Sequence, residues 1–307
     1  MQFCSAVYAL VRDRRARIGW YGPWKTDPER PGGASWELAR RMVEGRHELI
    51  PDERLANLRY GEPVPEDVEI LIVVAPRQEH PRVAFELDQF VQRGGKLVVL
   101  VDRVQYDALT HERLGPAGLE DVPPTGLEDL LAAYGARPTP EHVWDTLWAT
   151  EHSWLRARTG SNAAALGLPP ERIPVDSPLL IQVGAEGVDS AHPVTAGVSG
   201  VTFSWAHPIV PAEPPAGVVR TALLSSSEAS TLLIEPTALH VVDPEDIRAN
   251  SAALLASRKP RSYMLAAALE GTFPSPFERA PAPDDPLLSD ELPATTDEAV
   301  LSGAATT

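Results

Sequence analysis

The stretch DQFVQRGGKLVVLVD at residues 88–102 decides the fold of this chain. An amphipathic run ends at a Gly-Gly pair, and after one lysine five apolar residues lead to Asp102. This pattern predicts a helix, a left-handed cap at the glycines and a buried strand, which is the order that α/β sheets use. Ligand-binding carboxylates often follow such strands, so Asp102 is a candidate site residue. Its alternative role is structural, as an acceptor for loop N–H groups or a partner of Arg103 or Arg77.

Further strands and helices are expected on the amino-terminal side of this stretch. VEILIVVAP at 68–76 is apolar on both faces, as a central parallel strand requires. RIGWYG at 17–22 predicts an earlier strand, and HELI at 47–50 a possible one. Between them, ASWELARRMVEG predicts a helix whose apolar face holds Trp36, Leu38, Ala39, Met42 and Val43.

Strands and helices of this length, joined by short turns, predict right-handed parallel crossovers. The expected fold class is α/β, with a doubly wound, mostly parallel sheet similar to that of flavodoxin. We expect the strands at 68–75 and 97–101 to be adjacent, parallel and central in that sheet.

The second half of the chain is expected to be rich in strands. Four segments have strand length and an alternating or continuous apolar pattern: SPLLIQVG, GVTFSWA, GVVRTALLSS and SYMLAAALEG. Before them, TGLEDLLAAYGARPTP predicts a helix with a threonine N-cap and a glycine at its end, and HVWD a strand. Residues 148–174 are expected to form loop and short helix.

The charge balance excludes one class of partner. The chain has 43 acids against 27 Lys and Arg and a formal net charge of -16, so no broad cationic surface is available for nucleic acid. From 278 to 307 there are seven acids and one arginine among Pro, Ala, Ser and Thr residues. We therefore expect residues 1–277 to form the α/β domain, with a possible subdivision near 150–175, and 278–307 an acidic, Pro/Ala-rich, disordered tail.

The single cysteine, Cys4, excludes an internal disulfide framework and a cysteine-based zinc cluster. No run of 18 or more apolar residues is present, so we expect no membrane-spanning segment. The apolar FCSAVYALV is followed, not preceded, by basic residues, which favours an amphipathic helix over a signal peptide.

Three blocks of this sequence together resemble one family, the auxiliary components of ABC-type transport systems typified by the gliding-motility protein GldG. The blocks are VPEDVEILIVVAP with ELDQFVQRGGKLVVLVD; GLEDLLAAYGARPTPEHVWD; and HPVTAGVSGVTFSWAHPI with TALLSSSEAS and AAALEGTFPSPF. They follow one another in the family's order between residues 64 and 277.

The resemblance implies an extracytoplasmic (periplasmic) domain that works beside the membrane permease and ATPase subunits of an ABC transporter. It implies a fold like that of class I glutamine amidotransferases and of a domain of intraflagellar transport proteins. Family members are usually longer and membrane-anchored, so this chain resembles their middle domain alone.

Amidotransferase chemistry needs a cysteine nucleophile at a strand-to-helix elbow and a histidine base. The strand at 97–101 ends in VLVDRVQYD, without a cysteine, and Cys4 precedes the first strand. We therefore expect a non-catalytic accessory or binding domain without cofactor or metal. The alternatives are a hydrolase with an unrecognised nucleophile and a purely structural interaction module. An enzyme should bring acid, base and nucleophile together at the carboxyl ends of the strands, whereas a binding module should show an apolar or aromatic patch there.

Several other polar motifs are explained more simply by a structural role than by a functional one. Glu141-His142 and Glu151-His152, with Asp145 between them, lack a metal-ligand spacing. SSSEAS at 225–230 lacks the Gly-x-Ser-x-Gly elbow and is expected to be a polar turn after a strand. His192 and His207 each precede a proline, which favours extended or turn backbone, and both are expected to be structural.

The loop after the first strand contains the aromatic cluster WYGPW. Together with Trp36 it either forms an exposed stacking surface or packs between helix and sheet. The candidate ligand or partner surface therefore consists of Trp20, Tyr21, Trp24, Arg77, Asp102 and Arg103.

Overall fold

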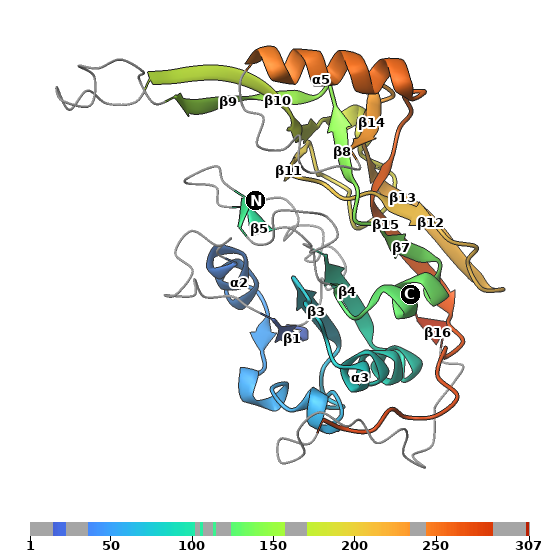
Figure 1. Cartoon of the computed structure of the whole chain (residues 1–307). Coiled ribbons are helices and arrows are strands. Elements are labelled where there is room, and N and C mark those ends of the chain that lie inside the picture. The colour runs from blue at the N-terminus through green and yellow to red at the C-terminus, as the bar shows by residue number, and fades with distance from the viewer. Residues whose placement is uncertain are drawn as a thin grey trace.

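A computed structural model of the chain describes residues 15–22, 36–101, 105–106, 113–114, 124–156, 171–233, 244–284 and 305–306. Helices α2 (Glu37–Glu44) and α3 (Pro81–Gln92) lie beside a parallel sheet. Helix α5 (Pro244–Ser257) lies beside a second group of strands, across the top of the view in Figure 1.

The parallel sheet confirms the expected α/β fold class. Its strands are β1 (Arg17–Tyr21), β2 (Glu48–Leu49), β3 (Ile70–Val74) and β4 (Lys96–Leu100). The order is β2-β1-β3-β4, and every neighbouring pair is parallel. β3 and β4 are adjacent as predicted, and β3 is central. The central position predicted for β4 is wrong within the described residues, because β4 ends the sheet there and its last four residues are only half-buried.

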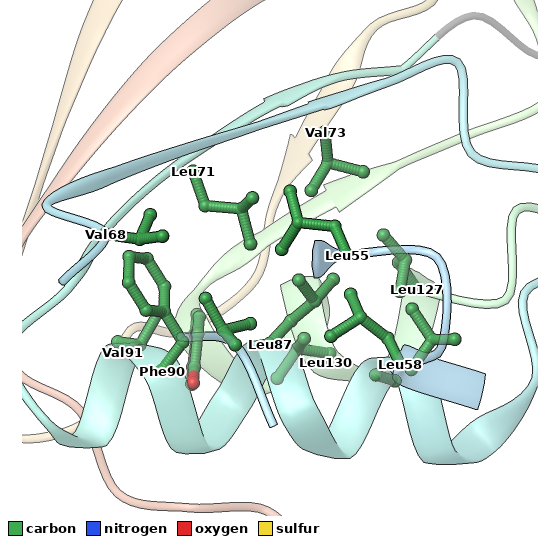
Figure 2. Packing of buried hydrophobic residues seen from close by; sticks show 14 of the residues in the cluster. Leu55, Leu58, Val68, Leu71, Val73, Leu87, Phe90, Val91, Leu127 and Leu130 are labelled. Atoms are coloured by element: carbon green, nitrogen blue, oxygen red, sulfur yellow. The ribbon is translucent and has the colours of Figure 1, made fainter. Parts of the chain in front are cut away.

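Alternate residues of β3 face two different cores, as in a doubly wound sheet. Leu71 and Val73 pack with the inner face of α3, and Figure 2 shows this cluster. The next residues on the opposite face, among them Ile72, pack with Val43 of α2. All five residues of β3 are buried, which explains the continuous apolar run in the sequence.

The predicted apolar face of α2 is wrong at one position. Leu38 is 70% exposed, whereas Arg40 is 8% exposed. Arg40 donates to the carboxylate of Glu44 at 3.1 Å and to that of Asp52 at 2.9 Å. Two carboxylate partners allow a guanidinium to occupy a buried position that the apolar pattern assigned to neighbouring residues.

Helix α3 begins at Pro81 and ends, as predicted, just before the Gly-Gly pair. His80 is the N-cap, and its Nδ1 accepts a hydrogen bond from Arg82 N at 3.2 Å. Pro81 occupies the first helical position, where a missing N–H costs nothing. After the helix, Gly94 adopts φ +88°, the left-handed conformation expected for the Gly-Gly pair.

The second half of the chain is sheet-rich, as predicted. Its elements are α4 (Glu128–Tyr134), β7 (Ala136–Pro138), β8 (His142–Asp145), β9 (Ala149–Arg156), β10 (Glu171–Val183), β11 (Val201–Ser204), β12 (Ile209–Pro211), β13 (Val218–Ser225), β14 (Ser230–Leu233) and β15 (Met264–Thr272). They form the antiparallel sheets β11-β10-β9, β12-β7, β14-β8 and β13-β15-β16, the last with β16 (Ala305–Thr306). The short elements are η1 (Asp52–Arg54), η2 (Leu58–Tyr60), η3 (Ala185–Gly187), β5 (Gln105–Tyr106) and β6 (Arg113–Leu114).

The loop and short helix predicted for residues 148–174 are wrong where the structure describes them. Strands β9 and β10 pair there as an antiparallel hairpin, which spans the possible subdivision near 150–175. Pro174 and Pro178 lie within β10 and weakened its strand pattern. They are tolerated because β11 pairs only with residues 180–183 of that strand.

The packed chain extends past residue 277, where the acidic tail was expected to begin. Ala280 is completely buried, and the carbonyl of Pro281 accepts from Arg82 Nη1 at 3.1 Å. Arg59 Nε donates to Asp284 Oδ2 at 2.7 Å. The segment 273–284 therefore covers the outer side of α3, and the remaining tail prediction at 285–304 lies outside the described residues.

Candidate functional site

The first residue of the fold-deciding stretch, Asp88, is completely buried on α3. Its Oδ1 accepts from Tyr134 Oη at 2.6 Å and Gln92 Nε2 at 3.1 Å. Its Oδ2 accepts from Ser275 Oγ at 2.7 Å and Gln89 Nε2 at 2.8 Å. Burial first, and then the Asp88 carboxylate, raise the pKa of Tyr134 far above its usual range, so the phenol stays protonated and donates. Asp88 therefore joins α3 to α4 and to the segment after β15.

A second buried carboxylate, Asp145, holds the SSSEAS segment. Its Oδ1 accepts from Leu147 N and Trp148 N, both at 3.0 Å, and from Ser227 Oγ at 2.7 Å. Its Oδ2 accepts from Ser227 N at 2.8 Å. The Ser227 hydroxyl also accepts from Ala229 N at 3.1 Å. The predicted polar turn is confirmed, and this serine is occupied by structural hydrogen bonds.

The carboxyl-terminal edge of the parallel sheet brings Tyr21 and Arg77 together through Glu79. Tyr21 Oη donates to Glu79 Oε2 at 2.7 Å, and Arg77 N donates to Glu79 Oε1 at 3.3 Å. Burial, and then the charge of Glu79, raise the pKa of Tyr21 far above its usual range. The loop after β3 also contains two left-handed non-glycine residues, Ala75 at φ 45° and Gln78 at φ 46°. The Glu79 carboxylate thus accepts hydrogen bonds from the end of β1 and from the loop after β3.

The turn before α4 accepts hydrogen bonds from the backbone of this strained loop. Gln78 N donates to Pro124 O at 2.8 Å, and Glu79 N donates to Thr125 O at 3.0 Å. Gly126 has φ +84°, and a Cβ there would lie 2.4 Å from Glu79 O. Only glycine fits between the two segments, so the loop after β3 and the turn before α4 form one rigid unit.

A family model described as an ABC-type uncharacterized transport system matches residues 35–303. The chain belongs to this family. It is an auxiliary component of an ABC-type transport system, as the three sequence blocks indicated. No curated protein and no solved structure gave a significant match. In the described part of the chain, no helix is both long enough and apolar enough to cross a membrane.

The structure divides the predicted site residues of this auxiliary component into three groups. Tyr21 and the backbone N–H of Arg77 meet at Glu79 on one edge of the sheet, and Glu79 carries no sequence signal beyond its position after a buried strand. Trp20 is 3% exposed and packs in the core between α2 and the sheet. Trp24, Asp102 and Arg103 lie outside the described residues.

The histidines of the second half pack against one another and against backbone. His142 is completely buried, with its ring centroid 4.4 Å from that of His207 and 5.5 Å from that of Trp205. His207 Nδ1 lies 3.0 Å from Glu141 O. His192 Nδ1 accepts from Val194 N at 3.2 Å. Among the side chains that the structure describes, no three His, Cys, Asp or Glu residues could hold a metal ion together.

The turn at Pro65, Glu66 and Asp67 in the first block is anchored by arginines. Arg54 Nη1 and Nη2 donate to the two oxygens of Asp67 at 2.9 Å each, and Arg17 pairs with the same carboxylate. The hydrogen bonds from Arg54 are the main cause that lowers the pKa of Asp67 below its usual value. This acid therefore ties the turn before β3 to η1 and to the start of β1.

Proposed function

We propose that this chain is a non-catalytic, extracytoplasmic accessory domain that works beside the permease and ATPase subunits of its ABC-type transport system and binds the permease. Membership of the family supports the transporter association. The extracytoplasmic position rests on the resemblance of the three sequence blocks to GldG-like components.

The observation that supports the non-catalytic role is how three carboxylates within the matched region, Asp88, Asp145 and Glu79, are used. Asp88 and Asp145 are completely buried, and each accepts four hydrogen bonds, two of them from its own segment and two from distant parts of the chain. Glu79 accepts from Tyr21 and from the backbone. A hydrolase needs a carboxylate that orients a base or activates water at a substrate. These carboxylates instead orient protein donors, which suits a domain that works by binding.

The test is co-purification of the tagged chain with the permease and ATPase of the same transport system in detergent, followed by transport in reconstituted vesicles. We expect the three subunits to purify together. The variant Glu79→Gln should keep association and transport within about twofold of the wild type, because Glu79 only makes hydrogen bonds within the domain. A catalytic acid or base would contribute about 100-fold or more. A loss of that size in a variant that still folds and associates would establish an enzyme instead.

A further inference from the structure

A hollow of about 250 Å³ lies at the amino-terminal edge of the parallel sheet, opposite the edge that carries Tyr21 and Glu79. One side is the turn before β3, with Glu66 and Glu69. The other side is the turn between α3 and β4, with Arg93 and Lys96. Both turns belong to the first of the three sequence blocks, and the carboxyl edge uses neither of them.

The hollow has an apolar floor and a rim of separated charges. Val68 and Phe90, 5% and 2% exposed, form the floor, and Figure 2 shows the Phe90 ring directed toward Val68. Glu66 on one rim is exposed, as is Lys96 on the other. A complementary surface would therefore carry an apolar group between a base and an acid.

The walls of the hollow are fixed by bonds that do not depend on a partner. Arg54 holds Asp67 at the end of one turn, and Val68 N donates to Pro65 O across it at 3.1 Å. Arg93 Nη2 donates to the carbonyl of Val64 at 3.0 Å and so ties the two sides together. A preformed site of this kind loses little entropy when a partner binds.

We propose that this hollow is the anchor socket for a loop of the permease subunit. The loop would place one apolar side chain over Val68 and Phe90, with an acid facing Lys96 and a base facing Glu66. Free small molecules usually occupy pockets of about 300–1,000 Å³, and in parallel sheets they bind at the carboxyl ends of the strands. A smaller hollow at the amino end suits a single side chain of a protein partner. This proposal rests on the proposed function, in which the permease is the binding partner of the chain.

The experiment measures the affinity of the full chain for the detergent-solubilised permease–ATPase complex. The rim variants are Glu66→Lys and Lys96→Glu. The matched controls, Glu186→Lys and Lys259→Glu, make the same charge changes at exposed positions of the second half. We expect each rim variant to weaken binding about tenfold or more and each control to stay within about twofold, with all four unfolding at the wild-type temperature.

Each alternative outcome overturns a different statement. If the wild type binds the complex and the rim variants bind equally well, the socket is wrong and the proposed function stands. If the wild type does not bind the complex, both are wrong. If the wild type sediments as a dimer and the rim variants as monomers, the hollow holds a second copy of the chain and the permease assignment is wrong.

Discussion

Replacing either of the two glycines after α3 by alanine should lower the stability of the fold, but for a different physical reason at each position. Gly94 has φ +88°, and a Cβ there meets nothing within 4 Å. Gly95 lies outside the left-handed range, but its Cβ would lie 2.3 Å from two ring atoms of Phe90. Alanine at the first position thus costs backbone strain, whereas at the second it causes overpacking of a core ring that is 2% exposed.

The magnitudes follow from these two costs. Gly94→Ala should lower the free energy of unfolding by about 1 kcal/mol, the cost of a left-handed L-residue less the entropy that alanine removes from the unfolded chain. Gly95→Ala should lower it by about 1–3 kcal/mol, as overpacked cores do. In a chain of this size, 1 kcal/mol corresponds to about 2–4 °C in the unfolding temperature.

A double-mutant cycle with Phe90→Leu separates the two mechanisms. Removing the ring should relieve the clash, so Gly95→Ala should become nearly neutral in that background, with a coupling free energy of about 1 kcal/mol or more. Gly94→Ala should cost the same in both backgrounds. Urea denaturation of the six proteins, followed by circular dichroism, measures all of these values. Equal costs of Gly95→Ala with and without the ring would refute the assignment of its role to Phe90.

Four further substitutions test the structural roles of other residues. Arg54 lowers the pKa of Asp67, so its contribution to stability is present above the unfolded-state pKa near 3.8 and is lost as the pH falls through the lower folded value. The variant Asp67→Asn should therefore lose less stability than the wild type in acid titration from about pH 5 to pH 2, and parallel curves would disprove the ion-pair role. Asp145→Asn should lower the free energy of unfolding by about 2–3 kcal/mol, since an amide cannot accept all four hydrogen bonds, and Ser227→Ala should cost less; the reverse order in chemical denaturation would contradict this network. Cys4→Ser should change neither the unfolding temperature nor permease binding, and a lost activity would revive a thiol mechanism.

The elements that sequence alone predicted are those whose signal is local. β3 is apolar on both faces because it is buried on both, and α3 has a proline at its start and a left-handed glycine after its end. The β9 and β10 hairpin was missed because prolines interrupt its pattern where, among the described residues, one edge of β10 pairs with no strand. Helix α5 was missed because its alanines and leucines do not gather on one clear face.

The hydrogen-bond partners of the candidate site could not be predicted, since they depend on long-range contacts. Tyr21 and Glu79 are 58 positions apart and meet only because β1 and β3 are neighbours in the sheet. Asp88 appears in the sequence as one more polar residue of an amphipathic helix. It is buried because the segment 273–284 covers the outer side of α3, and helical periodicity contains no information about that cover.

Three acids of the first two sequence blocks share one architectural feature. Asp67, Asp88 and Asp145 each join segments that are distant in the sequence, and each does so near the end of a strand or on the helix beside it. Asp88 and Asp145 are buried, and buried carboxylates cost free energy unless several donors surround them, so these two acids specify one arrangement of the segments rather than many. These acids therefore fix the arrangement of the segments, and under the proposed function the residues that contact the permease should be found on exposed rims such as that formed by Glu66 and Lys96.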